Sequence, residues 1–250
     1  MFRVRDAQEA AEYADEIFEN MKKQEDNFRP GPQPQITQKE RAQLIDFIEE
    51  LHAIFDLIPE TLFISIQTVD RFLSLKEGKT IEDLQRVAVA AVLIVSKYED
   101  IIPPSLDEMI KQMKKPCTRE DILLLETKIL NALDFDLTVP TTFRFLERFS
   151  RISPKYNSAM DFGEFVIELA NYDFNIVEKL KPSEIAAVSL YIGGIATSGL
   201  KNNQAKRSKP LEKASGVAMT KVKELATEYF SDLPRRVKET MKGRNIFRKY

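Results

Sequence analysis

The stretch Val87-Ala-Val-Ala-Ala-Val-Leu-Ile-Val95 decides the fold class, because nine consecutive apolar residues are expected to lie in the interior of the protein. Periodicity alone does not separate a buried helix from a buried strand in such a run. Two local features favour a helix. Thr80-Ile-Glu-Asp83 has the pattern of a helix N-cap with an acidic first turn, and no glycine or proline interrupts the run. A helix that is apolar on all sides is predicted to lie at the centre of a helical bundle.

On both sides of this run, apolar residues recur with the 3.6-residue period of amphipathic helices. One upstream face comprises Leu44, Ile45, Phe47, Ile48, Leu51, Ile54 and Phe55. Pro59 is placed to begin a second helix. Downstream, Ser105-x-x-Glu108 and Thr118-x-x-Asp121 have the pattern of N-caps, and each precedes apolar residues at helical spacing. The sequence therefore predicts five helices with the Val87–Val95 helix at their centre.

The same order of helices is predicted again after Pro140. The periodic segments of this half are Phe143–Phe149, Phe162–Leu169, Ile185–Ala196, Leu211–Val217 and Val222–Leu233. The third segment of each half is rich in alanine, as close packing against several neighbours requires. We predict an all-α fold of two tandem five-helix domains related as a structural repeat.

An N-terminal helix is predicted to precede the first domain, with Tyr13, Ile17, Phe18 and Met21 on its apolar face. The segment Phe28-Arg-Pro-Gly-Pro-Gln-Pro34 is predicted to be a linker, because its prolines and glycine disfavour a helix. The predicted boundaries are residues 1–37 for the helix and linker, 38–137 and 138–233 for the two domains, and 234–250 for a basic C-terminal tail.

The composition argues against several classes of protein. The net charge of −2 gives no excess of cations, which disfavours a large nucleic-acid-binding surface. No two of the eight glycines are spaced as G-x-G, which disfavours a dinucleotide-binding turn. One cysteine and one histidine are too few for a Cys/His metal site or an intramolecular disulfide. The charged N-terminus and a longest uncharged run of 16 residues lead us to expect a soluble, intracellular protein with no membrane partner.

Enzymatic interpretations find little support in the motifs. Gly194-x-x-x-x-Gly199 lacks the Lys-Ser/Thr that follows in a phosphate-binding loop. Cys117 and His52 have no recognisable orienting residue for a thiol dyad. We expect a non-catalytic protein without a cofactor or metal.

Two charged residues on strongly apolar segments are candidate functional residues. Lys97 ends the most hydrophobic predicted helix, and Glu126 lies among leucines and isoleucines. Buried lysine and glutamate are normally paired. They therefore form either an internal ion pair between two helices, or a surface site that hydrogen-bonds the backbone of a partner.

The chain also resembles the cyclin box of A/B-type mitotic cyclins over about residues 13–150. The motifs that carry this resemblance are Gln35-Ile-Thr37, Arg41-Ala-Gln-Leu-Ile-Asp-Phe47, Pro59-Glu-Thr-Leu62, Asp70-Arg-Phe-Leu-Ser74, Ser96-Lys-Tyr-Glu-Asp100, Pro103-Pro104, Glu126, Ile129-Leu130 and Leu133-Asp-Phe135. Lys181-Pro-Ser-Glu-Ile-Ala186 is similar to part of the C-terminal cyclin fold.

The resemblance implies a regulatory subunit that forms a heterodimer with a cyclin-dependent Ser/Thr kinase and activates it by holding the kinase C-helix in its active position. It implies a role in cell-cycle progression, in the nucleus and cytoplasm. The implied kinase-binding residues are Lys97, Glu126, Tyr98, Asp100, Ile101, Leu130, Phe135, Leu137, Tyr13 and Ile17. Arg41 and Asp70 match a pair that is internal in the family, so they are expected to be structural.

The resemblance also implies a patch that docks Arg-x-Leu motifs of substrates or inhibitors, formed here by Leu44, Phe47, Glu50, Leu84 and Gln85. Phe47 stands where the family usually has Trp, and Glu40 and Gln43 replace apolar residues, whereas the acidic Glu50 is retained.

An alternative is a cyclin-fold transcription initiation factor that bridges promoter DNA and polymerase. Such a protein is expected to have a basic second domain and usually a zinc ribbon, neither of which the composition favours. Two basic segments, 201–213 and 234–250, are interpreted as solvated, with nuclear import or binding of a phosphorylated substrate as alternatives between which the sequence does not decide.

Overall fold

The computed structural model describes residues 13–75, 84–151, 156, 158–198, 204–232 and 235. Twelve helices and no strand lie within these residues, which confirms the predicted all-α class. The first seven are α1 (Ala14–Gln24), α2 (Gln38–Ile54), α3 (Pro59–Ser74), α4 (Leu84–Glu99), α5 (Leu106–Lys111), α6 (Arg119–Ala132) and α7 (Thr142–Ser150). The others are α9 (Met160–Asn171), α10 (Phe174–Lys179), α11 (Pro182–Ser198), α12 (Gln204–Ser215) and α13 (Met219–Phe230).

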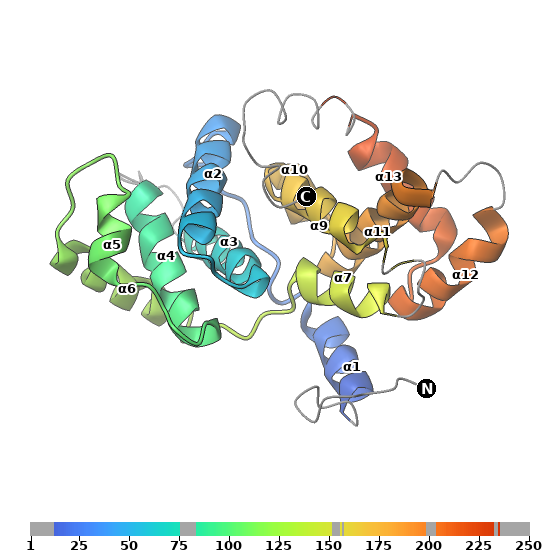
Figure 1. Ribbon diagram of the computed structural model, residues 1–250, viewed down its shortest axis with the longest axis horizontal. Coiled ribbons are helices and arrows are strands. Elements are labelled where there is room, and N and C mark those ends of the chain that lie inside the picture. Colours follow the sequence, from blue (N-terminus) through green and yellow to red (C-terminus); the bar gives the residue numbers. More distant parts are fainter. Residues whose placement is uncertain are drawn as a thin grey trace.

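The helices form two bundles in tandem, each built around one central helix (Figure 1). The run Val87–Val95 is entirely buried within α4, and α4 packs against α2, α3, α5 and α6. In the second bundle α11 packs against α7, α9, α12 and α13. The central position predicted for the third helix of each half is therefore confirmed.

The N-caps predicted from sequence are present where the structure describes them. The Ser105 side chain accepts a hydrogen bond from the Glu108 backbone N–H at the start of α5. Thr118 and Asp121 form a reciprocal capping box at the start of α6. Thr80–Asp83, the cap expected for α4, lies outside the described residues, as does most of the basic segment 234–250.

Two features of the second half differ from the sequence prediction. The structure adds α10, a helix of six residues that is too short to produce a clear apolar period. In addition, α12 covers Gln204–Ser215 rather than Leu211–Val217. It ends before Val217 because Gly216 adopts a φ of +68° and donates its N–H to the Glu212 carbonyl, a geometry that terminates helices.

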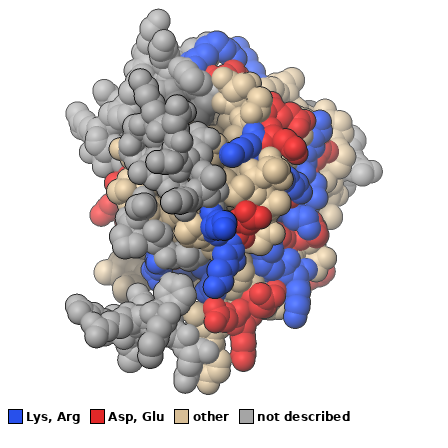
Figure 2. Space-filling model, turned by 90° about the vertical axis from the view of Figure 1, so that its right-hand side faces the viewer, with Lys and Arg blue, Asp and Glu red and all other residues tan. Residues whose placement is uncertain are grey.

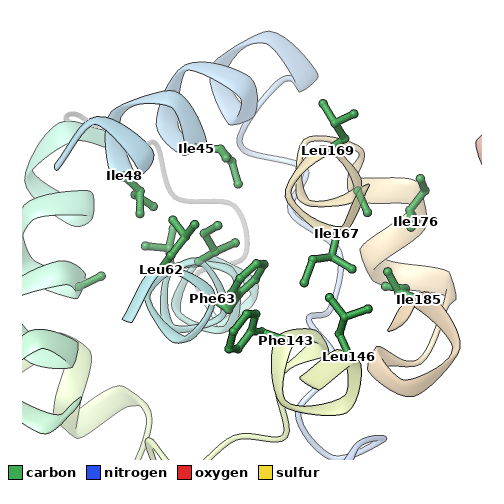
Figure 3. Packing of buried hydrophobic residues seen from close by; sticks show 14 of the residues in the cluster. Ile45, Ile48, Leu62, Phe63, Phe143, Leu146, Ile167, Leu169, Ile176 and Ile185 are labelled. Atoms are coloured by element: carbon green, nitrogen blue, oxygen red, sulfur yellow. The ribbon is translucent and has the colours of Figure 1, made fainter. Parts of the chain in front are cut away.

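The hydrophobic core continues from one bundle into the other through α3 and α7. The rings of Phe63 and Phe143 stack with centroids 5.4 Å apart (Figure 3). Figure 3 shows Ile45 and Ile48 of α2 on one side of this pair and Leu146 and Ile167 on the other. The two halves thus share a continuous apolar interface.

Helix α1 belongs spatially to the second half although it comes first in the chain (Figure 1). Phe18 packs edge-on against Phe145 and Phe149 of α7, at centroid distances of 5.9 and 6.0 Å. Just after α1, the Glu25 carboxylate accepts hydrogen bonds of 3.1 Å from the backbone N–H and the hydroxyl of Ser183. Glu25 therefore caps the positive N-terminal end of α11.

Candidate interaction surface

Lys97 and Glu126 meet at the surface where α4 and α6 pack together. Lys97 lies in the last turn of α4, and its Nζ atom is 2.6 Å from Glu126 Oε1. The Lys97 side chain is 47% exposed and that of Glu126 15%. The structure thus joins the two alternatives considered from sequence, because the residues form an ion pair with each other and the pair reaches solvent.

Several large apolar side chains are exposed on α4, on α6 and in the turns that follow these two helices. Ile101 and Ile102 follow α4 and are 99% and 84% exposed. Isolated exposed apolar residues are common, but a group of them indicates an interaction site. We name as the Lys97 surface the group Lys97, Glu126, Tyr98, Ile101, Ile102, Leu124 and Phe135.

Asp100 holds the end of α4 against the start of α3. One of its oxygens accepts the Ile58 backbone N–H at 3.0 Å, and the other accepts the Thr61 hydroxyl at 2.6 Å. Asp100 therefore caps α3 from the residue that directly follows α4. The carboxylate implied to bind a partner is already bonded within this chain, and it fixes the position from which Ile101 and Ile102 project.

The turn after α6 positions Phe135. Asp134 and Phe135 have φ angles of 50° and 58°, in the left-handed region that non-glycine residues rarely adopt. The Phe135 N–H donates to the Leu130 carbonyl at 2.9 Å, which ends the helix and directs the chain away from it. The Phe135 ring is 65% exposed as a result of this arrangement.

The remaining implied kinase-binding residues are placed differently. Leu130 is partly buried against the core, and Leu137 is buried within it, so Leu137 presents almost no surface in this conformation. Tyr13 and Ile17 are half exposed, but Tyr13 is the N-cap residue of α1 and Ile17 lies within α1, the helix that packs on α7. The implied kinase-binding residues therefore fall into two groups. One group belongs to α4, α6 and the turns that follow them, and the other, Tyr13 and Ile17, belongs to α1.

Arg41 and Asp70 form a buried, bidentate ion pair. Arg41 Nη2 lies 3.0 Å from Asp70 Oδ2, and Nη1 bonds to Oδ1. The same guanidinium donates from Nε and Nη2 to the Asn171 carbonyl at 3.0 and 2.8 Å. Because Asn171 ends α9, Arg41 links the two bundles as well as α2 and α3.

The five residues of the implied docking patch line one groove. It has a volume of about 630 Å³ and lies beside α2 and the start of α4. Leu44, Phe47, Glu50, Leu84 and Gln85 contribute to it, together with Glu40, Gln43, Asp46, Lys114 and Lys115. We call this the α2 groove. Leu44 and Phe47 are largely buried and form its apolar floor.

Several residues of these sites were not identified from sequence. Ile102 and Leu124 extend the Lys97 surface, and Lys114 and Lys115 line the α2 groove. A signal existed for Ile102, because it stands in a non-helical turn before Pro103-Pro104, where no apolar helix face accounts for it. The lysines gave no signal, since a pair of lysines in a loop usually indicates only a solvated segment.

No group of three or more His, Cys, Asp or Glu side chains that could hold a metal ion occurs in the described part of the chain. None of the described helices is long and apolar enough to cross a membrane.

Comparison with protein families matches both halves of the chain. The model of the cyclin N-terminal domain matches residues 16–138, and that of the cyclin C-terminal domain matches residues 140–250. Among solved structures, a viral cyclin from herpesvirus saimiri superposes with a TM-score of 0.67 at 23% identity, covering 85% of this chain and 97% of the viral protein. The similarity to the viral cyclin structure supports the assignment of the fold.

Curated relatives include G2/mitotic-specific cyclin-1 of Antirrhinum majus, 38% identical over 72% of this chain and 38% of its own length. G2/mitotic-specific cyclin-3 of Saccharomyces cerevisiae is 34% identical over 77% of this chain and 46% of its own length. The chain thus spans less than half the length of these relatives. Since the two family models together match nearly all of the chain, and its relatives are G2/mitotic cyclins, this protein belongs to the cyclin family.

Proposed function

We propose that this protein is a non-catalytic regulatory subunit that binds a cyclin-dependent Ser/Thr kinase and activates it during the cell cycle. The observation that carries the proposal is the Lys97 surface, which combines a solvent-exposed ion pair at the junction of α4 and α6 with exposed apolar side chains on the same elements and the turns that follow them. Its relatives named as mitotic cyclins support a cell-cycle role.

The ion pair can bind a partner without breaking. A lysine ammonium has three N–H donors, and a carboxylate has about four acceptor sites. The contact between Lys97 and Glu126 uses one of each, and Lys97 remains half exposed. The pair can therefore donate to a carbonyl and accept from an N–H of a partner backbone while staying intact.

The exposed apolar residues supply the affinity in this mechanism. A protein kinase is active only when a lysine of its β3 strand pairs with a glutamate of its C-helix. A partner that binds the active arrangement of that helix more tightly shifts the kinase towards it. A shift from about 1% to 99% active requires about 5.5 kcal/mol of differential binding. Burial of Ile101, Ile102 and Phe135 stabilises a complex by about 25 cal/mol per Å² of apolar surface, and it contributes to this difference where only the active arrangement of the C-helix covers these side chains.

The distribution of charge supports this function over the initiation-factor alternative. Figure 2 views the molecule from the side of α12 and α13, and in the described surface shown there Lys and Arg are interspersed with Asp and Glu. Lys221 of α13 forms an ion pair with Glu184 of α11. A protein that tracks DNA phosphates normally presents a continuous basic face.

The test is activation of a purified cyclin-dependent kinase on histone substrate by the wild-type chain and by variants. Ile102→Asp is expected to abolish activation, because it places a charge in the apolar contact, and Lys97→Ala and Glu126→Ala are each expected to reduce it at least tenfold. Leu75→Asp is the matched control, because Leu75 is also an exposed apolar residue. It lies at the C-terminal end of α3, whereas Asp100 contacts the N-terminal end of that helix. Full activation by an Ile102→Asp variant of unchanged helicity would show that the kinase interface is not at the Lys97 surface. Failure to activate any cyclin-dependent kinase would contradict the function.

We also propose that the α2 groove docks Arg-x-Leu motifs of substrates or inhibitors. Leu44, Phe47 and Leu84 offer an apolar site for the leucine, and the exposed Glu50 offers a carboxylate for the arginine. Glu50→Gln is expected to weaken binding of an Arg-Ala-Leu peptide without affecting kinase activation.

A further inference from the structure

The α2 groove is electrostatically asymmetric. Its acidic residues, Glu40, Asp46 and Glu50, all come from α2. Its two lysines, Lys114 and Lys115, come from the loop between α5 and α6. A ligand that fills the groove therefore meets carboxylates along one wall and ammonium groups on another part of the rim.

Two of the acidic residues are already engaged within the chain. Glu40 Oε2 accepts hydrogen bonds of 2.8 Å from the backbone N–H and the hydroxyl of Thr37, and these bonds lower the pKa of Glu40. Asp46 Oδ1 lies 2.8 Å from the Tyr172 hydroxyl. Glu50 is exposed and has no ion pair among the residues that the structure describes, so it is the carboxylate most available to a ligand.

Lys114 and Lys115, like Glu50, are accessible to a ligand. Both side chains are exposed, and neither takes part in an ion pair within the described chain. Their loop is nevertheless held in place, because the Lys114 backbone N–H donates to Gln85 Oε1 at 3.1 Å. Arg86 also donates to the Pro116 carbonyl at 3.4 Å, which adds a second contact between the start of α4 and this loop.

From this arrangement we infer that the α2 groove selects peptides whose apolar anchor is flanked by acidic residues, and that Lys114 and Lys115 pair with those residues. The inference rests on the docking role proposed for the groove and adds the sequence context that the groove prefers. The apolar floor and Glu50 hold the anchor and its basic neighbour, while the lysines discriminate between peptides by the charge beyond the anchor.

The experiment uses fluorescein-labelled twelve-residue peptides with a central Arg-Ala-Leu and binding measured by fluorescence anisotropy. Two peptides carry three glutamates, either before or after the core, and two reference peptides carry three glutamines or three lysines. At about 50 mM salt, one glutamate peptide is expected to bind about fivefold more tightly than the glutamine peptide, in line with one or two exposed ion pairs. The difference should vanish at about 500 mM salt, because exposed charges are then screened.

Charge reversal by Lys114→Glu with Lys115→Glu should invert the order, so that the lysine peptide binds most tightly. The matched control is Lys111→Glu with Lys128→Glu, which reverses two exposed lysines of α5 and α6 that do not line the groove, and which should keep the preference for glutamate. Circular dichroism verifies that both variants keep their helicity.

Equal binding of the glutamate and glutamine peptides by the wild-type chain would overturn the inference and leave the docking role intact. Equal loss of the preference in both double variants would also overturn it, because the effect would then follow net charge rather than the groove. If no Arg-Ala-Leu peptide binds, the docking role and the inference both fail, whereas the kinase activation assay continues to decide the regulatory function separately.

Discussion

The Tyr172 hydroxyl lies 2.7 Å from Glu49 Oε2 and so joins α9 to α2 across the junction of the two bundles. The same hydroxyl lies 2.8 Å from Asp46 Oδ1. A tyrosine hydroxyl has one hydrogen and can donate it to only one carboxylate at a time. Both contacts are satisfied when Tyr172 donates to Asp46 and a protonated Glu49 donates to the Tyr172 oxygen. Burial, with a smaller effect of nearby Glu168, raises the pKa of Glu49 to about 8, in agreement with this arrangement.

Stability is therefore expected to depend on pH through Glu49. Because its pKa is higher in the folded than in the unfolded chain, its contribution is complete below about pH 4.5 and is lost as the pH rises through 8. The Glu49→Gln variant, which mimics the protonated form, should lack this component and unfold at a higher temperature than wild type at pH 8.5. Thermal unfolding followed by circular dichroism between pH 5 and 9 measures the effect, with Glu50→Gln as the exposed control. Parallel curves for wild type and Glu49→Gln would contradict this role of Glu49.

Removal of Arg41 is expected to be strongly destabilising. The Arg41→Ala variant leaves Asp70 charged and buried and leaves the Asn171 carbonyl without the two Arg41 hydrogen bonds. Losses of about 3–5 kcal/mol are typical when one partner of a buried ion pair is removed. Arg41→Met combined with Asp70→Leu should cost less than Arg41→Ala alone, since no unpaired charge stays in the interior. Urea unfolding of the two variants makes the comparison, and a larger loss in the double variant would refute the explanation.

Loss of the Asp100 carboxylate is expected to release the start of α3. Asp100→Ala should cost about 1 kcal/mol, the usual effect of removing a helix cap, and Asp100→Asn should cost less because it keeps one acceptor oxygen. Hydrogen exchange should increase at the Ile58 amide and in the first turn of α3 in Asp100→Ala. Asp107→Ala is the control, because Asp107 only pairs with Arg119 on the surface and should change stability by less than about 0.5 kcal/mol. The interpretation fails if both alanine variants behave alike.

Two adjacent glycines of α11 should respond oppositely to alanine. A Cβ atom at Gly193 would lie 2.7 Å from the Ala159 carbonyl oxygen, so Gly193→Ala must push α9 and α11 apart and should cost about 1–3 kcal/mol. At Gly194 the nearest atom, in the Tyr156 ring, is 3.7 Å from that position. Gly194→Ala should therefore be neutral or stabilising by up to about 1 kcal/mol, because alanine favours helix. Thermal unfolding of the two variants tests this, and equal midpoints would show that the close approach is not rigid.

Features encoded in a few neighbouring residues could be predicted from sequence. The buried run of α4 and the caps at Ser105 and Thr118 are local patterns, and the structure has them where the pattern indicates. The limits of α12 could not be predicted, because a weak apolar pattern gave no indication of its start at Gln204. The added α10 is shorter than the window in which periodicity can be measured.

Features that depend on distant contacts could not be predicted. Asp46 and Glu49 are more than 120 residues from Tyr172 in the chain, and no local signal brings them together. The same holds for Asp100, whose role as a cap depends on the position of α3. The burial of Leu137 two residues after the exposed Phe135 follows from the left-handed turn between α6 and the next segment, which sequence spacing does not encode.

The attachment of α1 to the second bundle sets an order of events during synthesis. A ribosome makes α1 before α7 and α11. Phe145 and Phe149, which pack against Phe18, and Ser183, which donates hydrogen bonds to Glu25, are made more than a hundred residues later. The first bundle can fold around α4 during that interval, whereas the apolar face of α1 remains exposed to solvent. Until the second bundle emerges, α1 therefore exposes the apolar ring that Phe145 and Phe149 cover in the folded protein.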